Sequence, residues 1–359
     1  MIDCNFPIIR YEADQSAQQR GQVHGEAWGD AIAELVEIRT SLMREKNQSL
    51  TTQRIEELAM EQWAITKNYH AELAAELTGI AEGSGASLTN LIVLNNYTDF
   101  RDIQPVEDQG CSLVYVNQDD GPVVGQTWDM HGSAKRYVCL LDIHEPNGER
   151  VIVFSLVGCL GMMGFTSRAT AMGVNNINTD GAQAGALWPT IVRSVLQKPN
   201  QAAMAKCLLD APKTSGHNYL IAGTDQAEMW EVAPGVSECV GRKQNGESGF
   251  IFHTNHCLGT DVAARETSIS QNSTTYIRHG LLEKKLPNVR NWQGVYDLMN
   301  DHEGYPKSIC SNFQTDAQDP SITCGGAVGS LQTGKVTMWR GDQMHDKNFV
   351  EHQFQIVFN

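Results

Sequence analysis

The chain changes character near residue 108, and this change constrains the fold more than any other feature. Residues 16–100 carry apolar side chains at helical spacing, for example Ile32, Leu35 and Val36. After Asp108 the sequence changes to short apolar runs separated by turn residues such as Asp119-Asp120-Gly121. Consecutive strands with helices grouped between them predict an α+β fold in layers, not alternating βαβ units.

The strands and helices expected after Asp108 follow from this pattern. We interpret residues 101–110 (RDIQPVEDQG) as an exposed acidic loop, and residues 158–178 (GCLGMMGFTSRATAMGVNNIN) as a glycine-rich, loop-like segment. We find no internal repeat or long linker. The predicted helices are Leu187–Leu196, Ala202–Leu209, Thr275–Lys285 and Trp292–Met299. The predicted strands are Cys111–Val116, Val123–Trp128, Tyr137–His144, Val151–Leu156, Asn218–Gly223, Ala227–Val232, Gly249–Thr254, Gly326–Leu331, Lys335–Arg340 and Phe349–Val357.

Composition narrows the classes of partner. The formal net charge of -15 argues against nucleic acid or an anionic membrane surface. No apolar run is long enough for a transmembrane helix, nor for a signal peptide at the start. The 9 cysteines are scattered without a C-x-x-C pair, which fits reduced thiols better than a disulfide framework. We therefore expect a cytoplasmic protein that binds neither nucleic acid nor membranes.

Motifs for cofactors and metals are missing or weak. The glycines of GCLGMMG have neither the dinucleotide-binding nor the P-loop spacing, and neither G-x-S-x-G nor H-E-x-x-H occurs. The one candidate metal cluster is His253, His256 and Cys257. In a strand the two histidines would point in opposite directions, which is poor geometry for chelation. We expect neither a cofactor nor a metal ion.

The Gly110-Cys111 step offers a different chemistry. If the peptide bond between these residues were cleaved, Cys111 would carry a free α-amino group with a pKa near ~8, which could accept the proton of its own thiol. Before cleavage the same thiol could attack the carbonyl of Gly110, which a residue without Cβ leaves open. The alternative is that Cys111 is an ordinary buried thiol.

Asp129 is expected close to Cys111. It lies 18 residues further along the chain, enough for a strand, a turn and an antiparallel return. A carboxylate at this place can orient a terminal ammonium group or a thiol by a charge-assisted hydrogen bond. The alternative is an aspartate that simply ends a strand before a turn.

These residues carry a family resemblance. GCSLVYVNQDDGPVVGQTWDM resembles the start of the mature chain in the acyl-coenzyme A:6-aminopenicillanic acid acyltransferase-like family of self-processing N-terminal nucleophile (Ntn) hydrolases. That family is distantly related to the choloylglycine and penicillin V hydrolases. The resemblance spans most of the chain, because further segments match in order: Arg20-Gly21…His24-Gly25, Glu76–Gly83, Leu94-Asn95, Ser215–Ile221 and His253–His256.

The resemblance implies a four-layer αββα Ntn-hydrolase sandwich that is made as an inactive precursor. Cleavage between Gly110 and Cys111 would give a helical segment 1–110 and a chain 111–359, which would remain associated as one structural domain. Cys111 would be the nucleophile and Asp129 would orient it. The side-chain amide of Asn218 would stabilise the oxyanion, although an asparagine that simply begins a strand is the alternative.

Candidate substrate-binding residues come from three places. Methionine and phenylalanine side chains in the glycine-rich segment could form an adaptable acyl-binding wall, or could simply pack in the core. The tryptophan at a predicted helix start is a second candidate wall. Two arginines could replace those that the bile-salt and penicillin V relatives usually show, or could be a surface charge or an ion pair. The predicted set is Met162, Phe165, Arg168, Asn175, Trp188 and Arg278.

The expected reaction is hydrolysis or exchange of the amide bond of a small N-acyl compound through an acyl-thioester on Cys111. Water is the favoured acceptor because it needs no second binding site. The alternatives are an acyl-coenzyme A-dependent N-acyltransferase of the same fold, a zinc-dependent hydrolase, and an unprocessed binding protein without catalysis. Neither the identity of the substrate nor the oligomeric state follows from the sequence, which is compatible with a homo-oligomer.

Overall fold

Two β-sheets form the centre of the protein. The computed structural model describes residues 1–46, 51–97, 99, 110–267, 269, 273–312 and 319–358. Apart from Gly110, the loop predicted at residues 101–110 lies outside them. One sheet has 8 strands in the order β1 (Ile8–Tyr11), β4 (Val138–His144), β5 (Arg150–Leu156), β6 (Met163–Thr166), β7 (Thr170–Asn176), β8 (His217–Ala222), β9 (Ala227–Ala233) and β10 (Val236–Lys243). The other has 6 strands in the order β11 (Gly249–His253), β2 (Leu113–Gln118), β3 (Gly121–His131), β12 (Ser321–Ser330), β13 (Lys335–Arg340) and β14 (Val350–Gln355).

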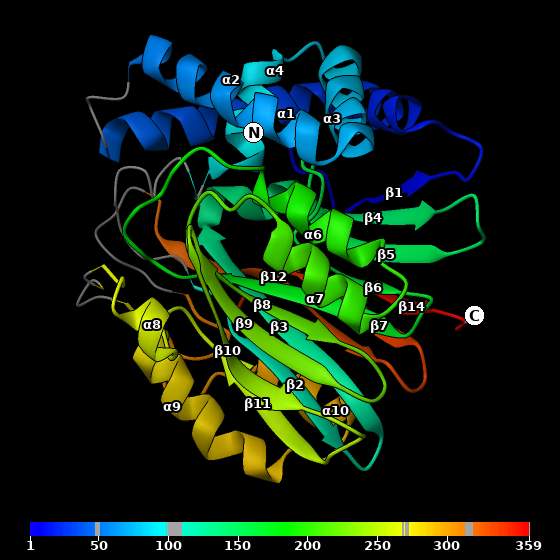
Figure 1. Ribbon diagram of the computed structural model, residues 1–359, viewed down its shortest axis with the longest axis vertical. Helices are drawn as coiled ribbons and strands as arrows, with labels where there is room; N and C mark the ends of the chain where they lie inside the picture. The colour runs from blue at the N-terminus through cyan, green and yellow to red at the C-terminus, as the bar shows by residue number, and fades with distance from the viewer. Residues whose placement is uncertain are drawn as a thin grey trace.

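Helices cover the outer faces of both sheets (Figure 1). α6 (Trp188–Leu196) and α7 (Gln201–Asp210) pack on the eight-stranded sheet. α9 (Thr275–Lys285) and α10 (Trp292–Met299) pack on the six-stranded sheet, where Val295 and Met299 join a buried cluster with Val114 of β2. The short α8 (Thr260–Ala263) lies against β9 and β10. This arrangement confirms the predicted four-layer αββα sandwich.

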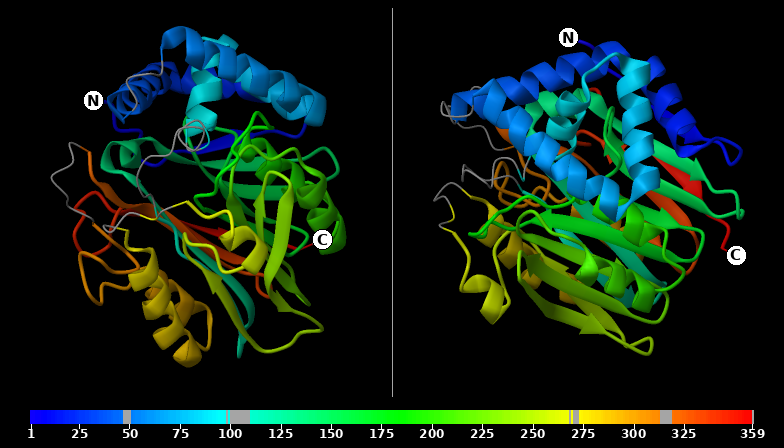
Figure 2. Two further views of the ribbon diagram at one scale, coloured as in Figure 1. Left: turned by 60° about the vertical axis from the view of Figure 1, so that its left-hand side comes forward. Right: turned by 45° about the horizontal axis from the view of Figure 1, so that its top comes forward.

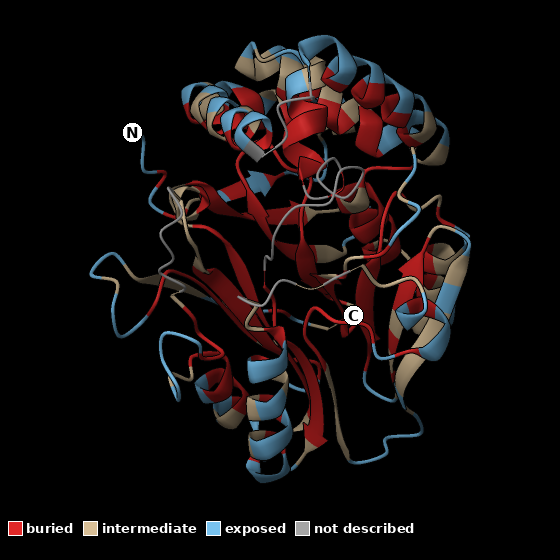
Figure 3. Ribbon diagram, turned by 90° about the vertical axis from the view of Figure 1, so that its left-hand side faces the viewer, coloured by how far each residue is buried: buried red, intermediate tan, exposed pale blue. Residues whose placement is uncertain are grey.

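The main core lies between the two sheets. Phe165 of β6 packs against β12 so closely that a Cβ on Gly329 would lie 2.3 Å from the phenylalanine ring. Figure 3 shows buried residues along both sheets, whereas exposed residues follow the outer faces of the helices. Within the described residues, no helix is both long enough and apolar enough to span a membrane.

Four further helices form a layer at one end of the molecule, above β4 and β5 (Figures 1 and 2). They are α1 (Ala17–Lys46), whose backbone departs from helical geometry at Trp28, α2 (Thr52–Tyr69), α3 (Ala71–Ser84) and α4 (Leu88–Asn95). This confirms the predicted helical character of the N-terminal part. The strand β1 precedes these helices and pairs in parallel with β4, so the N-terminal part also supplies one edge of a sheet.

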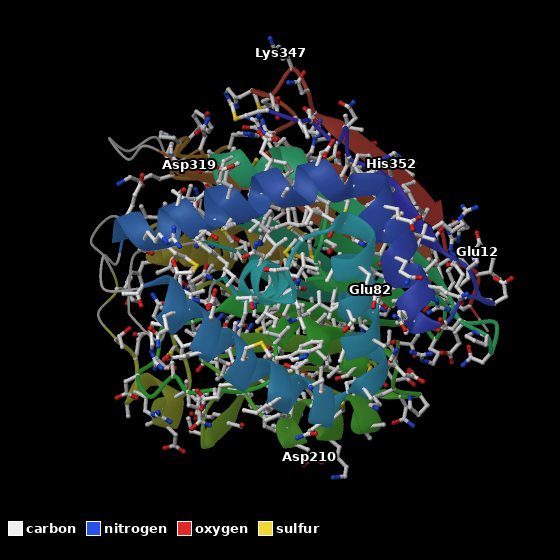
Figure 4. All side chains as sticks on the ribbon, turned by 90° about the horizontal axis from the view of Figure 1, so that it is seen from above. Glu12, Glu82, Asp210, Asp319, Lys347 and His352 are labelled. Carbon is white, nitrogen blue, oxygen red and sulfur yellow. The ribbon has the colours of Figure 1, made fainter. Side chains whose placement is uncertain are left out.

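Glycines allow α1 and α3 to cross in direct backbone contact. A Cβ on Gly21 would lie 2.0 Å from the carbonyl oxygen of Glu76, and one on Gly79 would lie 2.1 Å from that of Gln18. Beside this crossing, Glu82 of α3 (labelled in Figure 4) accepts hydrogen bonds of 2.8 Å from two glutamines of α1. Close packing of α1 on α3 therefore accounts for the two glycines of the matched RG…HG element.

The charged and polar residues of the same element connect the helical layer to the sheets. Arg20 pairs with Glu145 at 3.1 Å. His24 is fully buried and accepts a hydrogen bond of 2.8 Å from the backbone N–H of Gly158. Burial lowers the pKa of His24 to about 3, so the ring is neutral at physiological pH. A neutral ring suits its position as a structural acceptor.

One sequence prediction about the fold is wrong. The segment 158–178 is not a loop but contains β6 and β7, which lie in the middle of the eight-stranded sheet. Both strands are buried on both faces, so they lack the apolar-polar alternation by which half-buried strands are recognised. The strands β1 and β10 were also not predicted. The other predicted strands and helices correspond to observed elements, with shifts at their ends.

Candidate active site

The β2–β3 hairpin brings Asp129 back to the Gly110-Cys111 step, as predicted. The two strands pair with Leu113 opposite Gln126. The pairing continues toward the start of β2, where the backbone N–H of Asp129 donates a hydrogen bond of 2.8 Å to the carbonyl oxygen of Gly110. The carbonyl that Cys111 could attack therefore already has a hydrogen-bond donor aimed at its oxygen.

Gly110 occupies a position that has no room for a side chain. A Cβ there would lie 2.6 Å from Oδ2 of Asp129 and 2.8 Å from Nη2 of Arg278. Both atoms belong to buried side chains, which cannot move aside without breaking their other contacts. The glycine lets a carboxylate and a guanidinium group approach the peptide bond before Cys111.

Asn255 and Arg278 hold the backbone of Cys111. The N–H of Cys111 donates to Oδ1 of Asn255 at 2.8 Å. Arg278 also donates to this Oδ1 at 2.8 Å through Nη2, while its Nη1 donates to the carbonyl oxygen of Cys111 at 2.6 Å. The backbone N–H and the carbonyl group of Cys111 are thus both held by side chains.

Asn175 is the second donor to Cys111, and Asn218 lies behind it. Nδ2 of Asn175 is 3.0 Å from the carbonyl oxygen of Cys111. Asn175 on β7 and Asn218 on β8 are direct partners in the ladder, and Nδ2 of Asn218 donates to Oδ1 of Asn175 at 2.9 Å. The structure thus places the predicted oxyanion donor Asn218 one residue away from Cys111, with Asn175 between them.

Burial raises the pKa values of both Cys111 and Asp129. Burial, and then the charge of Asp129, raise the pKa of the Cys111 thiol to about 12, against the effects of the Asp129 N–H and Arg278. Burial likewise raises the pKa of Asp129 to about 6, although Arg278 and a hydrogen bond of 2.7 Å from Thr323 act in the opposite direction. In the uncleaved chain Cys111 is therefore a thiol, and Asp129 is a carboxylate that can accept a proton near neutral pH.

A cavity opens beside Cys111 and contains about 740 Å³ of space not occupied by protein atoms, part of it open to solvent. Its wall is mainly apolar, with a few polar side chains. The apolar lining includes Leu94, Trp128, Met130, Leu156, Met162, Met163, Val174, Trp188 and Pro189, and the polar lining includes Arg39, Asn95, Tyr97, Gln126, Asp129, Asn176, His217 and Asn255.

The predicted substrate-binding residues divide into three groups. Met162 and Trp188 line the cavity. Asn175 and Arg278 contact the backbone of Cys111 instead. The remaining two, Phe165 and Arg168, lie away from the cavity.

Physical reasons place Phe165 and Arg168 elsewhere. Phe165 points into the core between the sheets, against Gly329. Arg168 forms an ion pair with Glu149 and a hydrogen bond with the carbonyl oxygen of Leu196. Of the roles that the sequence allowed for Arg168, the structure shows the ion pair.

Sequence reasoning missed three contacts of the site. Asn255 lies within the matched segment His253–His256, where only the two histidines were considered as candidate ligands. Thr323 comes from β12, and nothing in its local sequence distinguishes it. Arg39 lines the cavity from α1, where it occurs within an ordinary amphipathic helix pattern.

The residues of the zinc alternative do not converge. His253 uses both ring nitrogens in hydrogen bonds of 2.7 Å, one with Glu231 and one with the carbonyl oxygen of Thr254. His256 bonds to Thr275 through Nδ1 at 3.0 Å. In the described part of the chain, the group whose ligand atoms do lie within 4.8 Å of one another is His302, Asp342 and His345.

Sequence comparison identifies the family. The model of the family described as "Acyl-coenzyme A:6-aminopenicillanic acid acyl-transferase" matches residues 116–343, well over half of the chain. The chain belongs to this family. A curated relative, the "Acyl-coenzyme A:6-aminopenicillanic-acid-acyltransferase 40 kDa form" of Emericella nidulans, is 26% identical over 298 residues, which make up 82% of each chain. The family model and this relative both carry the name of an acyltransferase, so the chain belongs to a family of enzymes.

Solved structures give weaker similarities. An N-acylethanolamine-hydrolyzing acid amidase ortholog of Caenorhabditis elegans has 12% identity and a TM-score of 0.41, over 62% of this chain and 93% of that one. A conjugated bile acid hydrolase mutant of Clostridium perfringens has 9% identity and a TM-score of 0.39, over 70% and 98%. Penicillin V acylase of Agrobacterium tumefaciens has 10% identity and a TM-score of 0.39, over 68% and 91%.

Proposed function

We propose that this protein cleaves its own chain between Gly110 and Cys111 and then acts as an amide hydrolase with Cys111 as N-terminal nucleophile. The observation that carries the proposal is the set of hydrogen bonds around that peptide bond. The carbonyl oxygen of Gly110 accepts from the Asp129 N–H at 2.8 Å, and the N–H of Cys111 donates to Asn255 at 2.8 Å. Any buried peptide bond is paired in this way, but this one also has a carboxylate and a guanidinium group against it, at 2.6 and 2.8 Å from where a Cβ on Gly110 would lie.

Processing begins with attack of the Cys111 sulfur on the carbonyl carbon of Gly110. Asp129 accepts the thiol proton, for which its raised pKa of about 6 suits it, and its backbone N–H stabilises the oxyanion. The bond between this carbon and the nitrogen of Cys111 then breaks, and the amine takes up the proton. Water hydrolyses the resulting thioester, which leaves a carboxylate on Gly110 and restores the thiol.

In the mature enzyme the new α-amino group of Cys111 is the base for its own thiol. In the uncleaved chain Asn255 accepts a hydrogen bond of 2.8 Å from this nitrogen, and the same contact would hold the free amine beside the thiol. The thiol attacks the substrate carbonyl, the amine half leaves with the proton, and the acyl group stays on sulfur as a thioester. Of the two asparagines, Asn175 contacts Cys111 directly and is oriented by Asn218, so we assign the oxyanion donor to Asn175.

The cavity favours an apolar acyl group and water as acceptor. Met162, Met163 and Trp188 provide a deformable apolar wall beside Cys111. The Emericella nidulans relative is named as a transferase from acyl-coenzyme A to 6-aminopenicillanic acid, so transfer to an amine is the second candidate. Both reactions would pass through a thioester on Cys111; they differ in the nucleophile that resolves it and, where acyl-coenzyme A is the donor, in the group that leaves when the thioester forms.

Intact-mass analysis of purified protein tests the proposal. Wild type should resolve into residues 1–110 and 111–359, whereas Cys111→Ala should give one chain of 39.6 kDa. Cys239→Ala is the matched control, because this cysteine is half-buried on β10 and should not affect cleavage. An uncleaved wild type that still hydrolyses amides, or a Cys111→Ala variant that still splits at this bond, would refute the mechanism.

We further propose that the two pieces stay associated after cleavage. The buried ion pair of Glu76 with Arg193, which has N–O distances of 3.0 and 3.1 Å, joins the helical segment to α6. Removing one partner from such a pair strongly destabilises a protein. Co-elution of both pieces in size-exclusion chromatography without denaturant is the expected result, and elution of segment 1–110 alone would contradict it.

A further inference from the structure

The buried arginines of this chain differ in one respect. Among the described residues, five arginines are buried: Arg20, Arg39, Arg193, Arg278 and Arg340. Four of them have a carboxylate oxygen within 4.0 Å, and the partners are Glu145, Glu76, Asp129 and Asp3. Arg39 has no carboxylate within this distance in the described parts of the chain.

Within the described residues, the contacts of Arg39 include no negatively charged group. Its side chain comes from α1, and the residue is only 2% exposed. The guanidinium group lies 4.4 Å from the centre of the Tyr97 ring, and Nη1 lies 3.1 Å from the sulfur of Met130. An aromatic face and a thioether are weak partners for a cation, and neither carries a negative charge.

A guanidinium group stays charged inside a protein, so burial has to be offset by a partner. Buried arginines are otherwise almost always paired, as the other four in this chain are. Arg39, Tyr97 and Met130 all line the cavity beside Cys111. The missing partner of Arg39 therefore has access from the cavity, which is where the substrate of the proposed reaction binds.

We infer that Arg39 binds an anionic group of the substrate, a carboxylate that reaches the guanidinium group from the cavity. This rests on the proposed function, because it assigns a substrate class to the same site. The carboxylate has two chemical sources. It belongs either to the acyl half, as in an ω-carboxyacyl amide, or to the amine half, as in an N-acyl amino acid.

Two matched pairs of compounds separate these sources. N-glutaryl-4-nitroaniline and N-pentanoyl-4-nitroaniline have acyl chains of equal length, and only the first carries a carboxylate on the acyl half. N-pentanoylglycine and N-pentanoylglycinamide differ only in the charge of the amine half. Processed wild type should prefer the charged member of one pair by roughly 10²-fold in kcat/KM. In Arg39→Gln this preference should fall below about threefold, mainly through a higher KM.

Arg44→Gln is the matched control, since Arg44 lies five positions further along α1 and is exposed on the surface. This variant should keep the substrate preference of wild type. Thermal unfolding provides a readout of stability that does not depend on turnover. Because Arg39→Gln removes a buried charge without a carboxylate partner, its melting temperature should equal or exceed that of wild type. A lower melting temperature with an unchanged substrate preference would assign Arg39 a purely structural role and overturn the inference.

A binding measurement separates failure of this inference from failure of the proposed function. Glutaramate, a monoanion, should raise the melting temperature of both wild type and the Cys111→Ala precursor, whereas neutral glutaramide should not. The shift should disappear in Arg39→Gln. If this pattern holds but no amide is cleaved, the proposed function fails and Arg39 still binds anions. If amides are cleaved and Arg39→Gln changes neither the preference nor the glutaramate shift, the inference fails and the function stands.

One further outcome would also overturn it. Cleavage creates a carboxylate on Gly110, and that group is an alternative partner for Arg39. In that case Arg39→Gln would weaken the association of segment 1–110 with chain 111–359 and leave all four amides with wild-type kinetics.

Discussion

Burial of Asp129 predicts a specific pH dependence of stability, which can be measured in the uncleaved precursor. The side chain is only 2% exposed, and burial raises its pKa from 3.8 to about 6. Between these two pH values the unfolded chain has released this proton while the folded chain retains it. The folded state therefore binds more protons, and its stability falls as the pH rises through this window. A difference of about two pKa units corresponds to ~3 kcal/mol.

The comparison is between Cys111→Ala and Cys111→Ala/Asp129→Asn, so that neither protein is cleaved. The free energy of unfolding of each is measured by urea denaturation from pH 4 to pH 7. The double variant, whose amide at this position does not titrate, should gain about 3 kcal/mol relative to its parent across this range. Asp142→Asn in the same background is the control, because hydrogen bonds and charge from Arg150 outweigh burial and lower the pKa of Asp142 below 3.8, so its difference from the parent should stay nearly constant from pH 4 to pH 7. A difference for Asp129 that stays constant within about 0.5 kcal/mol would refute the burial argument.

Two further predictions concern the donors of the site and the helix crossing. Asn175→Ala should lower kcat/KM of the processed enzyme by roughly 10²-fold or more. Asn218→Ala should lower it by less, because the Asn218 amide reaches Cys111 only through Asn175. Steady-state kinetics that show the reverse order would contradict this assignment. Gly79→Ala should destabilise the protein by about 2 kcal/mol in urea denaturation, since its methyl group would lie 2.1 Å from a backbone oxygen of α1. Gly280→Ala in α9 is its control: a Cβ there meets no atom within 4 Å, so stability should rise by about 0.5–1 kcal/mol.

The sequence was most informative where a pattern is local. The β2–β3 hairpin follows from alternating apolar runs and one turn, and it was enough to bring Asp129 to Gly110. The family resemblance supplied the layer arrangement, which periodicity alone could not. The strands β6 and β7 were missed because they lie in the middle of a sheet that is covered on both faces. Such strands have no polar face, so they lack the alternation of apolar and polar residues that identifies a strand in the sequence.

The site was less predictable, because its contacts join positions far apart in the chain. Asn255 and Arg278 meet Cys111 across separations of 144 and 167 residues. No local pattern encodes such contacts, and the two residue types are common on surfaces. The position of Asn218 shows the same limit on a small scale: the sequence indicated the correct strand pair, but not which of two facing asparagines contacts Cys111.

The parallel pairing of β1 with β4 has a consequence for how this enzyme can be produced. Residues 8–11 form the border of the eight-stranded sheet and cover the backbone of β4 along Leu140–Ile143. A gene that encodes only residues 111–359 would yield a chain whose β4 has unpaired N–H and C=O groups along a buried apolar strand, the kind of edge that recruits other chains. Residues 1–110 thus complete the sheet, and we expect soluble protein only when they are synthesised together with residues 111–359.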